Sequence, residues 1–205
     1  MCCAAWIRYC HALALAGLLA MSLSTLAATP DAGDKPLVLP PAAGRLLVAT
    51  PAMRGNYFRE SVILLTAHGR MGSVGVILNR PTVLRLSDLL PRRGGSLTLF
   101  EGGPVHPHLL SLLVLVPEQG FHQVGNTAGL SFVFGTQQVL DRLPVLRHGW
   151  RYRVYSGYSG WAPGQLMSEI RRGAWYVVEG DSAQVFDIHP DLLWVRLMRR
   201  VFPLR

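Results

Sequence analysis

Two histidines separated by one residue are the first side chains whose type and spacing could support chemistry. His106 and His108 would share one face of a strand, because side chains alternate across a strand, and neutral imidazoles bind zinc. A zinc site needs at least a third protein ligand, and no Cys, Asp or Glu stands at a recognisable spacing from this pair. Pro107 between them indicates a turn, so the sequence predicts neither a metal site nor a cofactor.

A serine nucleophile is the second candidate chemistry. Ser156 and Ser159 flank Gly157, but a nucleophile elbow requires Gly-x-Ser-x-Gly, and here Gly160 follows Ser159 directly. The sequence therefore predicts no catalytic residue. A hydrolase that uses Ser159 or the histidines is kept as an alternative.

An arginine at the end of an apolar run indicates an ion pair. Arg80 precedes a proline turn, and a guanidinium buried alone there would be costly, so we expect it to pair with Glu101; facing a ligand is the alternative. Gly102 and Gly103 could form an anion-binding nest, but Pro104 removes a donor and no Lys, Ser or Thr follows. A tight turn in which backbones approach closely is the preferred interpretation.

The segment Tyr158–Gln165 combines aromatic surface, glycines and a helix start, as small-molecule sites often do. We expect it to converge with Glu101–Val105, because glycine-rich turns at strand ends cluster at one rim of a bent sheet. In the alternative, Trp161 fills the core and Pro163 opens the helix. The predicted ligand groove comprises Asn79, Arg80, Glu101, Gly102, Gly103, Tyr158, Gly160, Trp161 and Gln165.

The residues named above must be positioned by strands and helices. In the sequence these elements alternate irregularly, which predicts an α+β fold. The glycine-rich segment 157–164 is expected to be a loop. Ser87 and Thr136 are expected to cap the first two helices. Strands are expected at 45–50, 61–67, 73–78, 97–100, 109–116, 130–134, 151–155 and 174–178, with 61–67 and 73–78 forming a hairpin, and helices at 86–90, 136–143, 165–172 and 191–201. The expected core contains Val62, Ile63, Leu64, Val76, Ile77, Leu113 and Val114.

The N-terminus has the pattern of an export signal. Residues 12–28 carry no charge and end in small residues, at 17 residues too short for a comfortable membrane-spanning helix. We expect a signal peptide at 1–28, a Pro-rich linker at 29–43 and a single domain at 44–205, located in the periplasm or exported. The three cysteines, Cys2, Cys3 and Cys10, all fall in the leader. An uncleaved anchor, or a cytoplasmic protein whose start lies further downstream, are the alternatives.

The charge is +8, and all basic residues except Lys35 are arginines spread along the chain. No helix-turn-helix, zinc or RNA-binding signature accompanies this charge, which argues against direct nucleic-acid binding. The C-terminal segment 192–205 is cationic and apolar, and peripheral membrane contact there is a second possibility beside an ordinary docked helix. The sequence leaves the oligomeric state open.

Three segments in order resemble the YqgE/AlgH family: Gly55–Pro81, Glu101–Val105 and Tyr158–Trp175. The resemblance covers roughly Gly44 to Arg200. It implies a strongly bent mixed β-sheet, partly barrel-like, surrounded by helices, and a family labelled as transcriptional regulators without a recognisable DNA-binding motif. The absence of a catalytic set, together with the leader, indicates a non-enzymatic binding or regulatory module of the cell envelope, with an unknown small molecule or protein as partner. A cytosolic regulator is the alternative.

Overall fold

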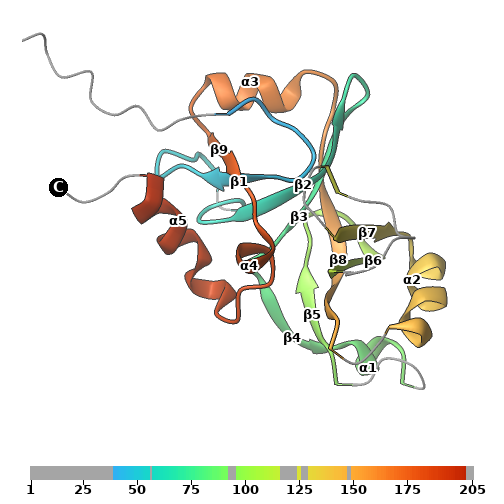
Figure 1. Ribbon diagram of the computed structural model, residues 1–205. Coiled ribbons are helices and arrows are strands. Elements are labelled where there is room, and N and C mark those ends of the chain that lie inside the picture. Colours follow the sequence, from blue (N-terminus) through green and yellow to red (C-terminus); the bar gives the residue numbers. More distant parts are fainter. Residues whose placement is uncertain are drawn as a thin grey trace, which may run out of the picture. The chain divides into compact units, whose positions relative to one another are not determined.

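A nine-stranded mixed sheet organises the chain in the computed structural model (Figure 1). The structure describes residues 39–55, 57–91, 96–115, 124–125, 129–146 and 149–201. The predicted signal peptide at 1–28 and residues 29–38 of the predicted linker lie outside the described residues.

The sheet has one main path and one branch. Its strands follow the order β4 (Pro81–Arg85), β5 (Thr98–Glu101), β8 (Arg151–Trp161), β3 (Gly72–Ile77), β2 (Val62–Gly69), β1 (Arg45–Ala49) and β9 (Trp175–Glu179). The branch is β6 (Val105–Leu115), which pairs with β8, and β7 (Leu130–Phe134), which pairs with β6. Only β5 and β8 pair in parallel among the described strands. The predicted mixed α+β fold is confirmed, although the sheet does not close, so its barrel-like character is minor.

Five α-helices accompany the sheet in the part of the chain that the structure describes: α1 (Leu86–Leu89), α2 (Thr136–Arg142), α3 (Gln165–Arg171), α4 (Ser182–Val185) and α5 (Leu193–Val201). Figure 1 shows α5 beside β1 and α2 beside the β6–β7 pair. Short 3₁₀ turns, η1 (Leu143–Val145) and η2 (Pro190–Leu192), follow α2 and precede α5, so the single helix expected at 191–201 is divided.

The predicted helix caps are wrong at two positions. Arg85, not Ser87, is the N-cap of α1, and Gly135, not Thr136, is the N-cap of α2. The hydroxyl of Thr136 instead accepts a hydrogen bond from the Leu110 backbone N–H at 3.1 Å. The Thr136 hydroxyl, which the local pattern predicted to cap the helix, is therefore used in a tertiary contact instead.

The core confirms the burial predicted from apolar runs. Leu46, Val48 and Leu64 pack in one cluster, whereas the alternate residues Leu47 and Ile63 pack in another. Because side chains alternate across a strand, β1 and β2 are buried on both faces. All seven predicted core residues are fully buried: Val62, Ile63, Leu64, Val76, Ile77, Leu113 and Val114.

The predicted loop at 157–164 is wrong over most of its length, because β8 continues to Trp161. The first half of β8 lies between β5 and β6, and the second half pairs with β3. The strand changes partners at Gly157, whose φ of +71° is readily accessible only to glycine. One strand thus belongs to both parts of the sheet. Its high glycine content is the reason that the sequence predicted a loop there.

Sequence reasoning missed β4. Val83 is 95% exposed, and every other residue of the strand is exposed except Thr82, which is half-buried, so the strand has no buried apolar face. Without that alternation, the period-2 pattern that reveals half-buried strands is absent.

Candidate functional site

The structure brings two of the predicted segments into backbone contact. A Cβ built on Gly102 would lie 2.3 Å from the Gly157 carbonyl oxygen, and one on Gly103 would lie 2.2 Å from the Tyr158 carbonyl carbon. Val105 pairs directly with Tyr158 in the β6–β8 ladder. Glu101–Val105 therefore meets the start of Tyr158–Gln165, and the glycines are needed because the two backbones approach too closely for any side chain.

Arg80 and Glu101 form the expected ion pair, and a third residue joins them. Arg80 Nη1 lies 3.8 Å from Glu101 Oε2, and its guanidinium lies 4.9 Å from the ring centre of Tyr57. The Tyr57 hydroxyl donates a hydrogen bond to Glu101 Oε1, and Arg80 Nη2 donates to the Tyr57 carbonyl. Partial burial, together with the Glu101 carboxylate, raises the pKa of Tyr57. The contacts among Tyr57, Arg80 and Glu101 hold the segment around Tyr57 against the ends of β3 and β5.

Asn79 performs a similar task beside this triad. Its Oδ1 accepts from the Val62 N–H at 2.8 Å, and its Nδ2 donates to the Glu60 carbonyl at 2.8 Å. Glu60 has a φ of +54°, an uncommon conformation for a residue with a side chain. The oxygen and the nitrogen of the Asn79 amide therefore both stabilise the backbone from Glu60 to Val62, where β2 begins.

Trp161 and Gln165 converge on Glu169 of α3 instead of on Glu101. The indole N–H groups of Trp161 and Trp175 both donate to Glu169 Oε2, at 2.9 and 2.8 Å. Gln165 Nε2 donates to Glu169 Oε1 at 3.0 Å. Trp161 is 5% exposed and fills the core, as the alternative interpretation held. This carboxylate links α3 to β8 and β9, and no sequence pattern had pointed to it.

Most residues of the predicted groove therefore hold strands and turns together, whereas Tyr158 borders an open hollow. That hollow has a volume of about 550 Å³ and is lined by His106, Pro107, His108, Leu109, Phe134 and Tyr158. We call it the aromatic hollow. Phe134 meets Tyr158 edge to face at 5.2 Å between ring centres, and His106 stacks on Tyr158 at 6.0 Å.

The histidine side of the aromatic hollow is built on an irregular stretch of β6. The pairing of β6 with β8 is interrupted between Val105 and Leu110, and His106 has a φ of +46°. Pro107 lies in this bulge, not in a free turn, and its carbonyl accepts a hydrogen bond from the Ser156 hydroxyl. Bulges commonly redirect side chains near functional sites, and strained backbone concentrates there. Both features put His106 and His108 at the wall of the hollow.

The other candidate chemistries find little support in geometry. Ser159 is fully buried and donates its hydroxyl hydrogen bond to the Gly102 carbonyl at 3.1 Å. Within the described residues, no group of three His, Cys, Asp or Glu side chains is placed to hold a metal ion. Among those residues there is also no helix long and apolar enough to cross a membrane. The groups that face the aromatic hollow are suited to binding: aromatic faces and two imidazoles.

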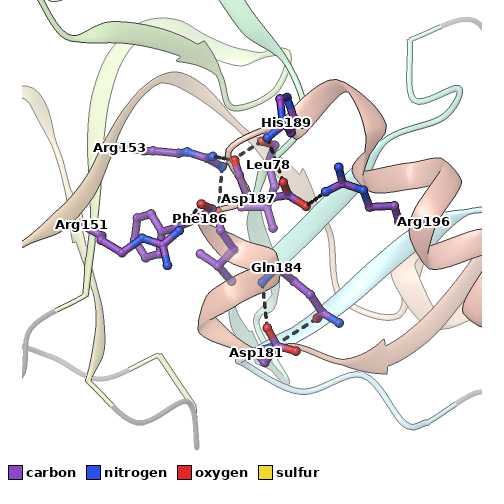
Figure 2. A network of polar contacts seen from close by, with 10 residues as sticks. Leu78, Arg151, Arg153, Asp181, Gln184, Phe186, Asp187, His189 and Arg196 are labelled. Atoms are coloured by element: carbon purple, nitrogen blue, oxygen red, sulfur yellow. Dashed lines mark hydrogen bonds and ion pairs between the residues drawn. The ribbon is translucent and has the colours of Figure 1, made fainter.

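A separate polar network joins β8 to the segment that precedes α5 (Figure 2). Arg153 donates to the carbonyls of Leu78 at 3.3 Å and Val185 at 2.8 Å, and also to the Asp187 carbonyl. Its guanidinium lies 4.6 Å from the Phe100 ring centre. Because these donors are directed at backbone carbonyls of the chain, the network fixes α4 and the following turn.

The Asp187 carboxylate completes this network with an ion pair to Arg196 of α5. Burial by itself would raise the pKa of Asp187, but hydrogen bonds from Arg196 and the His189 N–H, with the nearby positive charge, lower it overall. No sequence pattern indicated that the arginines of β8 would contact the segment between α4 and α5.

Comparisons with known proteins agree with the fold. A family model described as AlgH-like matches residues 46–203. A UPF0301 protein of Streptomyces coelicolor is 37% identical over an alignment of 169 residues, and the match covers 77% of this chain and 85% of the relative. A UPF0301 protein of an Anaeromyxobacter species is 32% identical over an alignment of 184 residues, and the match covers 82% of this chain and 90% of the relative.

Two solved structures share the architecture. The solution structure of the AlgH protein from Pseudomonas aeruginosa superposes with a TM-score of 0.64 at 25% identity, covering 82% of this chain and 93% of that one. The crystal structure of a Corynebacterium diphtheriae protein gives 0.63 at 28% identity, covering 80% and 88%. The names of these proteins state no activity.

Proposed function

The chain belongs to the AlgH-like family, and we propose that it is a non-enzymatic binding module whose ligand occupies the aromatic hollow. The observation that carries the proposal is the hollow itself. Phe134, Tyr158 and His106 line about 550 Å³ of open volume, beside a strained bulge. Ligand sites are typically concave, mostly apolar and supplied with a few polar groups that orient the ligand.

The chemistry of the lining defines the ligand class. His106, His108 and Tyr158 are the titratable residues of the lining, which among the described residues contains neither a carboxylate nor a guanidinium. Imidazole N–H groups donate hydrogen bonds and can carry positive charge, whereas nothing in the lining repels an anion. An apolar or aromatic group that carries a carboxylate fits this arrangement.

Binding of aromatic carboxylates tests the proposal. Indole-3-acetate and 4-phenylbutyrate are titrated into the ¹⁵N-labelled protein, and shifts are expected for the backbone amides of Phe134 and Tyr158. Phe134→Ala should weaken binding at least tenfold without loss of folding, because Phe134 is 44% exposed. Met71→Ala is the matched control, since Met71 is 91% exposed at the β2–β3 turn. Absence of shifts at these amides up to millimolar ligand would refute the proposal.

The compartment of this module is proposed on the leader pattern of residues 1–28. An apolar stretch with a small-residue exit is what export and signal peptidase require. We therefore place the mature protein in the cell envelope. Mass spectrometry of the native N-terminus decides the matter: a chain that begins near residue 28 supports export, whereas a soluble cytosolic chain that retains Met1 favours the cytosolic regulator.

A further inference from the structure

The geometry points to an extended polypeptide segment as the ligand, which adds as a strand to the edge of β7 that no other described strand pairs with, while its side chains enter hollows on either side of Phe134. The inference rests on the proposed function of the aromatic hollow and names its partner class. Three observations carry it: a second hollow, the unpaired backbone of β7, and the charge of the lining.

The second hollow, here the helix-side hollow, lies between β7 and α2 and has a volume of about 520 Å³. Its lining consists of Phe132, Val133, Phe134, Gln138, Asp141, Arg142 and Val145. Consecutive residues of a strand point to opposite faces, so a hollow that contacts all of 132–134 must run along the strand's edge. Because Phe134 lines both hollows, they adjoin at this edge.

The backbone of β7 is available along the same edge. Among the described strands, β7 pairs only with β6. The Gly135 N–H donates to the Leu110 carbonyl at 3.1 Å, which fixes the alternation of the antiparallel ladder. Val133 and Ser131 then direct their N–H and C=O groups to β6, whereas Phe132 and Phe134 direct theirs outward.

One further hydrogen bond supports this assignment. The Leu130 carbonyl should also point outward, and it accepts from the Val124 N–H at 2.8 Å. The edge is therefore closed at Leu130, and within the described part of the chain no backbone partner outside the β6–β7 ladder meets Phe132 or Phe134. These two residues offer two donors and two acceptors to an added strand, the pattern that β-augmentation uses.

Side-chain complementarity sets the sequence of the partner. Residues of an added strand that alternate in direction would place apolar side chains beside Phe132 and Phe134. The aromatic hollow at the Phe134 end presents His106 and His108 and no negative charge, so it favours an acidic residue there. The expected partner is an extended segment with apolar residues at positions i and i+2, flanked by Asp or Glu.

A phage-displayed library of random decapeptides, selected on the full-length protein, tests the inference. Enriched peptides should show the alternating apolar pattern with a flanking acidic residue, and fluorescence anisotropy should give at least tenfold weaker binding to Phe134→Ala, with Met71→Ala unchanged. A backbone N-methylation scan of one enriched peptide leaves the protein untouched. Methylation of alternate amides should weaken binding at least tenfold, and methylation of the amides between them should have little effect.

The remaining outcomes overturn the inference in distinguishable ways. Failure to enrich any peptide, or an N-methylation profile without alternation, removes strand addition. If aromatic carboxylates still shift the Phe134 and Tyr158 amides, the proposed function stands and only the polypeptide partner falls. Enriched peptides that bind Phe134→Ala normally occupy another surface. A concentration-dependent dimer that Phe134→Asp abolishes in analytical ultracentrifugation would assign the edge to a second copy of the chain instead.

Discussion

Replacement of Glu169 by alanine provides a direct test of how α3 is held on the sheet. The carboxylate accepts hydrogen bonds from the indoles of Trp161 and Trp175 and from the Gln165 amide. Trp161 and Trp175 are 5% and 2% exposed, so removal of the carboxylate leaves two buried N–H donors without an acceptor. Each such loss costs about 1–3 kcal/mol, and the exposed Gln165 contact adds little. We expect Glu169→Ala to lower the free energy of unfolding by roughly 2–6 kcal/mol.

The amide variant separates the acceptor from the charge. Glu169→Gln keeps one carbonyl oxygen, so it retains an acceptor for the indoles, and we expect roughly half of the alanine effect. Urea denaturation followed by far-UV circular dichroism measures both, because that signal does not depend on tryptophan emission. Met71→Ala, at a side chain that is 91% exposed in the β2–β3 turn, is the control and should change stability by less than about 0.5 kcal/mol. A Glu169→Ala protein within about 1 kcal/mol of the wild type would refute the reasoning.

Three further predictions concern the contacts that hold the sheet together. Gly103→Ala places a Cβ 2.2 Å from backbone and should prevent stable folding, whereas Gly69→Ala meets nothing within 4 Å and should leave the melting temperature nearly unchanged. Arg153→Met removes its hydrogen bonds to backbone carbonyls and should accelerate amide hydrogen exchange in α4, with about 2–4 kcal/mol lost in urea denaturation. The lowered pKa of Asp187 stabilises the fold above the ordinary value of 3.8, and this contribution is lost as the pH falls through the lowered value. Denaturation between pH 2 and 6 should therefore show a shallower acid dependence for Asp187→Asn, and an unchanged slope would contradict the Arg196 ion pair as its cause.

The candidate site illustrates how motif residues can differ from ligand residues. Gly102, Gly103, Arg80 and Asn79 stand out in the sequence because unusual backbone approaches and buried polar groups demand special residue types. Those same demands arise wherever strands cross closely, so the residues mark how the sheet is built. Phe134, by contrast, looks like an ordinary strand residue, and its place between two hollows depends on elements that are distant in sequence.

The sequence by itself determined the buried strands and the main pairing. Continuous apolar runs at 62–65 and 74–78 can be satisfied only by burial on both faces, and their Gly-containing turn dictates a hairpin, so the core followed directly. The ion pair between Arg80 and Glu101 also followed, since an isolated buried charge is too costly to leave unpaired.

Only the tertiary structure decided where β8 bends, which strand edge is open, and what Glu169 and Arg153 hold. Gly157 permits both a loop and a left-handed bend within a strand, and local propensity cannot distinguish them, because the choice depends on β3, β5 and β6 as neighbours. That β7 pairs only with β6 among the described strands is likewise a property of pairing order, which is fixed by contacts between residues far apart in the chain. Hydrogen bonds to a single carboxylate or guanidinium from several elements leave no periodic trace in sequence, because they require only that the folded backbone place those groups together.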